Sequence, residues 1–305
     1  MLKVVETPKV RRRLIKTADG AELGGTLFMP AVEPRAALVL NGATGVPQTY
    51  YSAFAHWAAA EHRIAVLTYD YRGTGRSLSG PMRLSSAAMS DWGLRDNAAA
   101  RKHLRQAVPD APLWIMGHSL GTMLLPMQED IGGIDRVIGV ASGFVHHMDH
   151  PWPYRALALY FWFGLPPLLT RLFGYLPGRR FGLGADMPAT AYREWRQWCT
   201  TKDLYDGSLR DSLPAPDWSR SGAPVRLISL TDDDVCPEPC TRRLAEFYSG
   251  HAVIETLDPR DYGLGKVGHI AAFAKRNEAL WTSILTGEPA RLQRPEVQMQ
   301  QGFAH

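Results

Sequence analysis

The sequence predicts an α/β fold: a mostly parallel, doubly wound sheet with helices on both faces and a helical insertion. Two observations predict it. Short, uninterrupted apolar runs alternate with helix-like segments from residue 36 to 141 and again from 225 onward, and such runs are typical of strands buried on both faces. A single interval, 145–224, interrupts the alternation. At 305 residues, the chain has the length of one large unit with an insertion.

The elements before the interruption follow in a regular order. Residues 10–16 and 23–29 read as two strands joined by a turn at Asp19 and Gly20. Short strands and helices then alternate, and Asp91 stands where a side chain would cap the second helix. The expected strands are 37–40, 64–68, 113–116 and 137–141, and the expected helices are 50–62, 91–107 and 122–127.

The alternation resumes after the insertion. The expected elements are strand 225–230, helix 237–248, strand 252–257 and a final helix over 269–285. We therefore assign residues 1–144 and 225–290 to an α/β core and 291–305 to a polar C-terminal tail. The interval 145–224 holds 14 of the 30 aromatic residues and 9 of the 22 prolines. Because structureless loops of that length are uncommon, we expect a small helical lid over one end of the sheet.

Composition excludes several classes of protein. Hydrophobic residues make up 45% of the chain and charged residues 21%, which rules out an intrinsically disordered chain. The net charge is +4 and the basic residues are scattered, so we expect no nucleic-acid partner. The longest apolar run, between Arg155 and Arg171, is interrupted by Pro166 and Pro167, so we expect no stable membrane insertion. The lack of an export signal at the start and the three cysteines favour a cytoplasmic location.

Residues 117–121 read GHSLG and match the pattern G-x-S-x-G. An apolar strand enters the motif and an apolar, helix-like segment leaves it, which is the context of a nucleophile elbow. The serine of such an elbow occupies a sharp, strained turn, and side chains at Gly117 and Gly121 would collide with neighbouring backbone. The pattern therefore predicts Ser119 as a catalytic nucleophile.

A serine hydroxyl needs a base to remove its proton during attack. In this kind of site the acid and then the histidine follow the serine along the chain. We assign His269 as the base because it lies just before the predicted final helix, whereas His251 stands at the start of a strand. Three candidate acids stand side by side at residues 232–234, directly after strand 225–230. Three adjacent carboxylates repel one another, so we expect one against the imidazole and two facing water.

Together these motifs resemble those of the α/β-hydrolase superfamily, in particular its lidded serine hydrolases of the lysophospholipase-like and serine-aminopeptidase-like branch. The resemblance spans residues 10–287. It rests on the Asp-Gly turn at 19–20, NGATG at 41–45, DYRGTGRS at 70–77, the elbow, DDVCP at 233–237 and Gly-His at 268–269.

The resemblance implies which acid completes the triad. In such enzymes the acid commonly stands four residues before a proline, and Asp233 holds that place relative to Pro237. The implied triad is therefore Ser119, Asp233 and His269, with Asp232 and Asp234 in reserve.

The same resemblance implies an oxyanion hole. One donor is the backbone N–H of Leu120, the residue after the nucleophile. The second comes from the loop after strand 37–40, where the family usually has His-Gly. Here Asn41 replaces that histidine, and Ala43 takes the place of the second donor. Each donor would stabilise the oxyanion by about 3–4 kcal/mol. Asn41 is also suited to orient the loop, and its role stays open.

Other signals point away from metals and cofactors, and we expect neither. The glycines of segment 72–77 lack the third glycine of a dinucleotide loop. The histidines at 146, 147 and 150 lack the helical spacing of metal ligands. The aromatic run 160–163 points all around a helix, so we expect a mixture of packing within the lid and contribution to the pocket wall. We assign Trp162 and Phe163, together with Thr44, to the substrate pocket. Contact of this run with a membrane interface is the alternative.

We therefore expect a serine hydrolase that cleaves a carboxylic ester, lactones included, with a hydrophobic group through an acyl-enzyme. Amide or peptide hydrolysis and acyl transfer would use the same triad and are alternatives. A rival of another class is a non-catalytic member of the fold that only binds a ligand. Loss of a triad residue would favour that rival, and none is lost. The expected partner is a small, hydrophobic ester, and the oligomeric state is not predicted.

Overall fold

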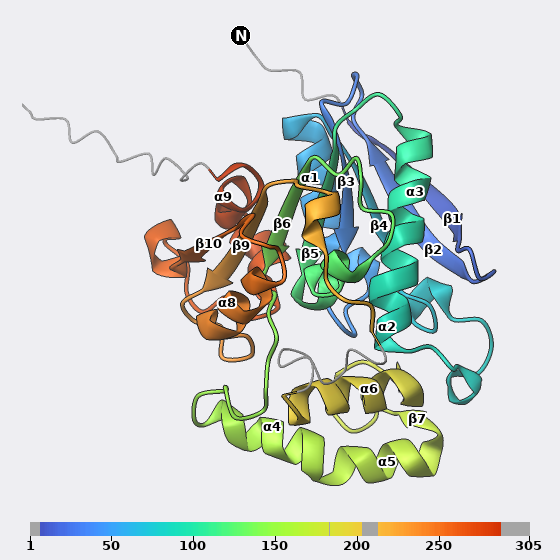
Figure 1. The fold of residues 1–305 in the computed structure, drawn as a ribbon, viewed down its shortest axis with the longest axis vertical. Helices are drawn as coiled ribbons and strands as arrows, with labels where there is room; N and C mark the ends of the chain where they lie inside the picture. The colour runs from blue at the N-terminus through green and yellow to red at the C-terminus, as the bar shows by residue number, and fades with distance from the viewer. Residues whose placement is uncertain (1–6, 183, 203–212, 288–305) are drawn as a thin grey trace, which may run out of the picture.

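The computed structural model describes residues 7–182, 184–202 and 213–287, and these form a sheet of eight strands (Figure 1). The strand order is β1-β2-β4-β3-β5-β6-β9-β10. β2 is antiparallel to both of its neighbours, whereas all other neighbouring strands are parallel. This confirms the predicted fold class. The strands are β1 (Lys9–Lys16), β2 (Glu22–Met29), β3 (Ala36–Asn41), β4 (Ile64–Tyr69), β5 (Leu113–His118), β6 (Arg136–Val140), β9 (Val225–Leu230) and β10 (Ala252–Leu257).

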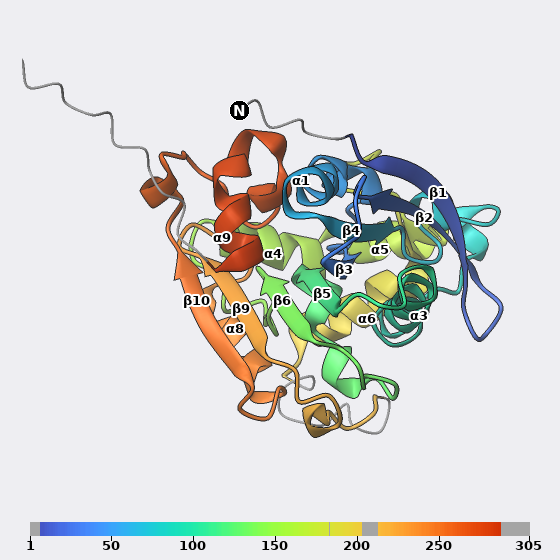
Figure 2. The ribbon, with the colours of Figure 1, turned by 90° about the horizontal axis from the view of Figure 1, so that it is seen from above.

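Helices cover both faces of this sheet (Figure 2). Strands β3 and β4 consist entirely of buried residues, because their side chains meet apolar helices on either side. One apolar layer contains Phe54 and Trp281, and the other contains Leu104 and Leu244. The helices of the first layer are α1 (Ser52–His62) and α9 (Trp281–Thr286), and those of the second are α3 (Asn97–Ala107) and α8 (Glu238–Glu246).

The segment after the serine is less helical than predicted. It forms two separate 3-10 turns, Ser119–Thr122 and Leu125–Met127. Pro126 accounts for the break, because it lacks the N–H that the interior of an α-helix requires. The turn at the serine therefore does not lead into a long helix.

The predicted final helix is also broken. Only α9 is an α-helix, and it is preceded by 3-10 turns at Ala271–Phe273 and Lys275–Leu280. Ala274 between the two turns has extended backbone angles (φ −68°, ψ 139°). The Asn277 side chain donates to the Ala271 carbonyl at 2.8 Å, and such side-chain bonds compete with the helical hydrogen bonds.

The helix that follows β4 begins earlier than predicted. It starts as α2 (Met89–Asp91), widens into a π-helical turn over Trp92–Asp96 and continues as α3. Asp91 therefore lies inside the first turn and is not the capping residue. Its carboxylate nevertheless accepts the backbone N–H of Ala88 at 3.1 Å, so it still satisfies a donor at this helix end.

The described part of the insertion places α4, α5 and α6 across the carboxyl ends of the parallel strands (Figure 1). Between them, the ring of Trp162 packs on those of Phe161, Tyr192 and Trp195, with centroid distances of 4.6, 6.0 and 5.0 Å. Residues 203–212 of the interval and the predicted tail at 291–305 lie outside the described residues. The elements are α4 (Tyr154–Phe163), α5 (Leu165–Phe173), α6 (Ala189–Thr200) and a short ribbon of β7 (Tyr175–Leu176) and β8 (Met187–Pro188).

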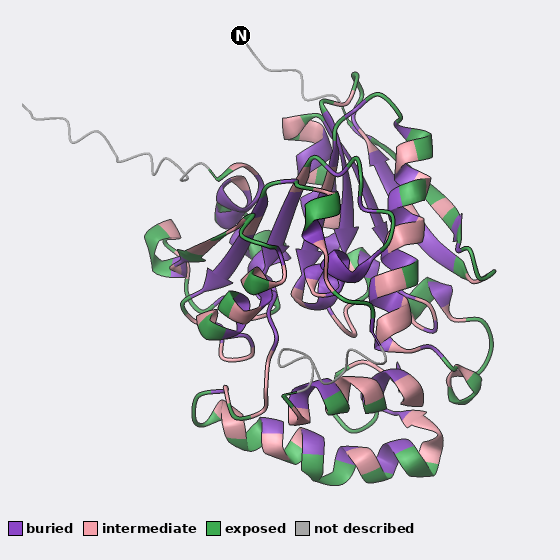
Figure 3. Ribbon diagram, viewed as in Figure 1, coloured by how far each residue is buried: buried purple, intermediate pink, exposed green. Residues whose placement is uncertain are grey.

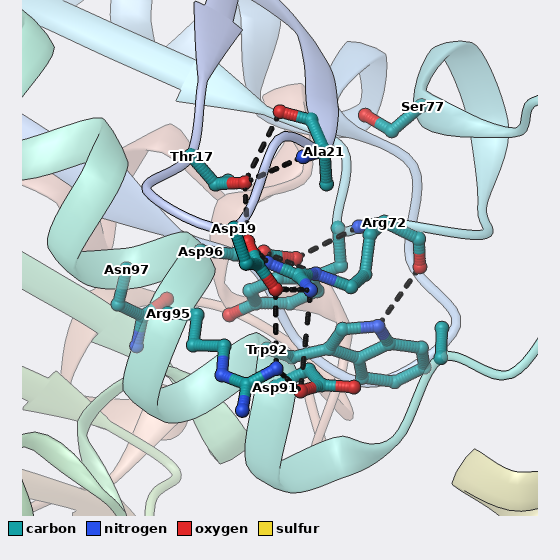
Figure 4. Close-up of polar contacts among 12 residues, drawn as sticks. Thr17, Asp19, Ala21, Arg72, Ser77, Asp91, Trp92, Arg95, Asp96 and Asn97 are labelled. Carbon is teal, nitrogen blue, oxygen red and sulfur yellow. Dashed lines mark hydrogen bonds and ion pairs between the residues drawn. The ribbon is translucent and has the colours of Figure 1, made fainter.

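Arg72 ties the loop after β4 to two other elements (Figure 4). Its Nε and its backbone N–H donate to the buried Asp96 carboxylate at 2.7 and 2.8 Å. Its Nη1 donates to Asp19, in the β1–β2 turn, at 2.6 Å. These side-chain hydrogen bonds from Arg72 hold the pKa of Asp19 well below its ordinary value. One guanidinium thus fixes three segments that are far apart in the sequence.

We expect Arg72→Ala to lower the free energy of unfolding by about 3–5 kcal/mol, because it leaves a buried carboxylate without its cation. Asp96 would then stay charged and unpaired or take up a proton, and both cost free energy. Urea unfolding measures the loss. Arg95→Ala is the matched control, because Arg95 is 60% exposed and pairs with Asp19 and Asp91 at the surface, so its loss should cost about 1 kcal/mol or less. Equal losses for the two variants would contradict this account.

Candidate active site

Ser119 occupies a strained turn between β5 and the first 3-10 turn. Its φ is +55°, in the left-handed region that residues other than glycine rarely adopt. A Cβ on Gly117 would lie 2.4 Å from the carbonyl carbon of Gly121, and one on Gly121 would lie 2.4 Å from the carbonyl oxygen of Asn41. Both positions therefore require glycine, because a larger side chain would collide with neighbouring backbone, as the motif predicts.

The structure brings together the three residues of the predicted triad. His269 Nε2 lies 2.9 Å from Ser119 Oγ, and His269 Nδ1 lies 2.8 Å from Asp233 Oδ2. Asp233 also accepts the backbone N–H groups of Val235 and Cys236 at 2.8 and 2.9 Å. Burial alone would raise the pKa of Asp233, but His269 and these hydrogen bonds bring the pKa below its ordinary value. The carboxylate is therefore ionised at neutral pH.

The three adjacent carboxylates have separate partners. Asp232 accepts the backbone N–H groups of Val267 and Gly268 at 2.6 and 3.1 Å and so holds the loop that carries His269. Asp234 makes an exposed ion pair with Lys266 at 2.8 Å. We expected two of the three carboxylates to face water, and Asp234 does so. Asp232 does not, because it is bonded to the loop that carries His269, and the neighbouring sequence does not indicate these bonds.

A buried relay of hydrogen bonds joins the elbow to the two loops beside it. Burial lowers the pKa of His118 to about 3, so its ring is neutral. Since Nε2 lies 2.8 Å from the carbonyl oxygen of His269, the single ring proton is on Nε2. Nδ1 then accepts from the hydroxyl of Tyr51 at 2.9 Å, and the Tyr51 oxygen accepts the Ala43 N–H at 2.8 Å.

This relay corrects the prediction for the second oxyanion donor. The Ala43 N–H already has Tyr51 as its acceptor, so it is not free for a substrate. The next N–H along the loop belongs to Thr44, which lines the cavity above Ser119. Among the described residues no acceptor hydrogen-bonds this N–H. Asn41 orients the loop, since its Nδ2 donates to the carbonyl of Gly121 at 3.0 Å.

A cavity of about 450 Å³ opens above the serine, between the sheet and the inserted helices. Its wall includes Trp162, as predicted, but not Phe163. Neighbouring residues on a helix point about 100° apart, and the Phe163 side chain turns outward, where it is 52% exposed and packs on His147 and Arg196. Phe163 is therefore not a pocket residue in this structure. The cavity is lined by Thr44, Ser119, Leu120, Phe161, Trp195, Trp198 and His269, among others.

A family model described as the alpha/beta hydrolase family matches residues 37–280, which is most of the chain. The chain belongs to the alpha/beta hydrolase family. The match includes the serine, the three carboxylates and the histidine of the site. A search of curated protein sequences finds no significant match.

Solved structures share the fold of this alpha/beta hydrolase at low sequence identity. An esterase from Pyrococcus furiosus is 13% identical, with 93% of this chain and 91% of that chain covered and a TM-score of 0.57. A thermostable carboxyl esterase from Bacillus coagulans is 12% identical, with 82% and 90% covered and a TM-score of 0.54. An acylaminoacyl peptidase from Pyrococcus horikoshii is 14% identical, with 99% and 44% covered and a TM-score of 0.52. At these identities the likeness concerns the fold.

Three residues of the site in this alpha/beta hydrolase escaped sequence reasoning. Tyr51 lies in the 3-10 turn before α1 and reads there as an ordinary core aromatic. His118 stands at a variable position of the elbow motif. The structure shows that its ring is fully buried, and a buried polar ring needs hydrogen-bond partners. Asp232 reads as a solvated neighbour of Asp233. Each acts through a contact with a distant segment.

Proposed function

We propose that this chain is a serine hydrolase that cleaves carboxylic esters, lactones included, with a hydrophobic acyl or alcohol group. One observation carries the proposal. The hydrogen-bonded chain from Ser119 through His269 to Asp233 lies at a cavity whose walls carry the aromatic residues of α4 and α6. The fold shared with two esterases supports it.

The reaction follows from this arrangement. Ser119 Oγ attacks the ester carbonyl carbon while His269 Nε2 takes its proton, and the ionised Asp233 stabilises the imidazolium through Nδ1–H. The tetrahedral intermediate collapses as the ester C–O bond breaks, and His269 gives the proton to the leaving alcohol. Water then repeats the sequence on the acyl-enzyme, which releases the acid and restores Ser119. These steps use only protein groups and water.

The oxyanion of the intermediate needs donors that are free in the resting enzyme. The N–H of Leu120 follows the nucleophile directly, and Leu120 lines the cavity. We assign the N–H of Thr44 as the second donor in place of that of Ala43. The loop that carries it is a turn closed by the Val46 N–H on the Ala43 carbonyl at 3.1 Å, with Gly45 at φ +73°. These features define a type II turn in which Thr44 is the first central residue.

The assignment of Thr44 is tested by Thr44→Pro, because proline suits the first central position of a type II turn but has no N–H. We expect kcat toward a soluble ester to fall about 10²–10³-fold. Thr44→Ala keeps the N–H and is the matched control, with little expected change in kcat. Equal activity of the two variants would show that the Thr44 N–H is not the second oxyanion donor.

The preference for hydrophobic substrates is tested by Phe161→Ala, which removes part of the cavity wall. Against a series of p-nitrophenyl esters from acetate to octanoate, we expect kcat/KM to fall about tenfold for octanoate, equivalent to about 1.4 kcal/mol, and far less for acetate. Phe163→Ala removes the same kind of side chain two positions further along α4, where it does not line the cavity, and should leave the series unchanged. A uniform loss across the series would contradict a role in substrate selection.

We also propose a cytoplasmic location. Cys199, Cys236 and Cys240 are all free and buried, which is compatible with a reducing compartment.

A further inference from the structure

The outer face of α4 and α5 is apolar, and no other described residues of the chain cover it. More than half of the exposed large hydrophobic side chains of the described residues lie between Trp152 and Phe181, and Figure 3 shows exposed residues along the side of α4 and α5 that faces away from the sheet. Leu168 and Leu172, the two most exposed leucines of these helices, have exposed fractions of 62% and 74%. We call these residues the α4–α5 face: Leu157, Tyr160, Phe163, Leu165, Leu168 and Leu172.

The spacing of these residues makes the face continuous. Leu165, Leu168 and Leu172 follow at intervals of three and four, which places them on one side of α5. On α4 the opposite side carries the buried Ala158 and Trp162. Except at Leu157, which also lines the cavity, the α4–α5 face is thus a second apolar surface, separate from the one that packs toward the cavity. Isolated exposed leucines need no explanation, but a contiguous exposed patch marks an interaction site.

The segment has the length and composition of a membrane span but not its shape. Tyr154–Phe173 covers 20 residues, its most apolar stretch of 18 residues has a mean hydropathy of 1.3, and 28% of that stretch is buried in the protein. At Gly164 (φ −88°, ψ −132°) the backbone leaves the helical region, so the segment is two helices and not one rod. Its apolar surface therefore suits a position along an interface.

The charged residues within the segment that carries the face have one sign. Between Asp149 and Asp186 the sequence holds no acidic residue, and its arginines are Arg155, Arg171, Arg179 and Arg180. The Arg155 guanidinium lies 5.9 Å from the ring of Trp152, and that of Arg180 lies 5.8 Å from the ring of Phe181. Cations beside exposed aromatic rings are the pattern by which interfacial helices bind anionic headgroups.

We propose that the α4–α5 face docks this protein on the surface of an anionic phospholipid bilayer. The leucines enter the boundary between headgroups and acyl chains, and the four arginines face the lipid phosphates. A second copy of the chain fits this face less well, because a two-fold contact would set the arginines of one copy against those of the other. Leu157 is 53% exposed and also lines the cavity, so docking brings the cavity mouth to the bilayer.

Vesicle co-sedimentation of the full chain tests the docking. Ser119→Ala is used as the background, so that lipid cleavage does not alter the vesicles and the result does not depend on the proposed activity. We expect binding to vesicles with about 30% phosphatidylglycerol to be at least tenfold tighter than to pure phosphatidylcholine, and to weaken when the salt rises from about 0.1 to about 1 M.

Two double variants locate the contact. Leu168→Glu with Leu172→Glu should lower binding at least tenfold, because it places carboxylates on the α4–α5 face. The matched control, Leu14→Glu with Val253→Glu, changes two residues on the edge strands that are 55% and 68% exposed, and it should bind like the background protein. Thermal melting checks that both pairs fold.

Three results would overturn the proposal. They are no binding to the anionic vesicles, equal binding to neutral and anionic vesicles, and an equal loss in the two double variants. A concentration-dependent dimer that the Leu168 and Leu172 pair abolishes, without vesicle binding, would assign the face to self-association instead.

Discussion

Replacement of Ser119 by alanine is expected to lower kcat toward a soluble ester by about 10⁴–10⁶-fold. The variant has no Oγ to attack the carbonyl, and only the oxyanion donors and substrate binding remain. His269→Ala should cause a loss of the same size, because the hydroxyl then keeps its proton during attack. Steady-state kinetics on p-nitrophenyl butyrate measures both.

The double variant Ser119→Ala/His269→Ala sharpens this test. The two side chains are joined at 2.9 Å and act in one step, so the double variant should be about as active as either single one. Losses that add up would mean that the two residues act independently, which contradicts the mechanism. Thermal melting of the three variants excludes unfolding as the cause.

Asp233→Asn is expected to lower kcat about 10⁴-fold with the fold intact. An amide has no negative charge to stabilise the imidazolium, and it can present an N–H where His269 needs an acceptor. The pKa of Asp233 lies below its ordinary value, so the carboxylate is ionised at neutral pH and the wild-type chain loses this support only as the pH falls through that lowered value.

The neighbouring carboxylates supply matched controls for this prediction. Asp234→Asn removes only an exposed ion pair with Lys266 and should have almost no effect. Asp232→Asn keeps one acceptor oxygen for the N–H groups of Val267 and Gly268, so we expect an intermediate loss of about tenfold. If the three variants lost activity equally, the assignment of Asp233 as the triad acid would be arbitrary.

The features that depend on local sequence were predictable. The alternation of apolar runs with helix-like segments indicated a parallel α/β sheet, because strands that are buried on both faces appear in the sequence as uninterrupted apolar runs. The elbow carried its own signal, since the glycines at 117 and 121 are where a Cβ would strike backbone. The histidine and the group of carboxylates were located by chain order and by position after a strand. These signals need no knowledge of distant contacts.

The features that were missed depend on tertiary contacts. Helical periodicity led us to predict helices that continue through Pro126 and Asn277. The missing N–H of Pro126 breaks the first helix, and the Asn277 side chain, which competes for a backbone carbonyl, breaks the second. Phe163 was grouped with Trp162 although one helical step separates a buried position from an exposed one. Ala43 was assigned by its place in a motif, and only the position of Tyr51 reveals that its N–H is already bonded.

Labelling with a fluorophosphonate, followed by intact-mass and peptide mass spectrometry, tests the central claim most directly. A fluorophosphonate reacts with a serine whose proton is removed by a neighbouring base. We expect one adduct per chain, located on Ser119, with ester hydrolysis falling in proportion to the labelled fraction and no labelling of His269→Ala. Hydrolysis that persists in fully labelled protein, an adduct on another residue, or a folded chain that neither labels nor hydrolyses any ester would contradict a Ser119-dependent hydrolase.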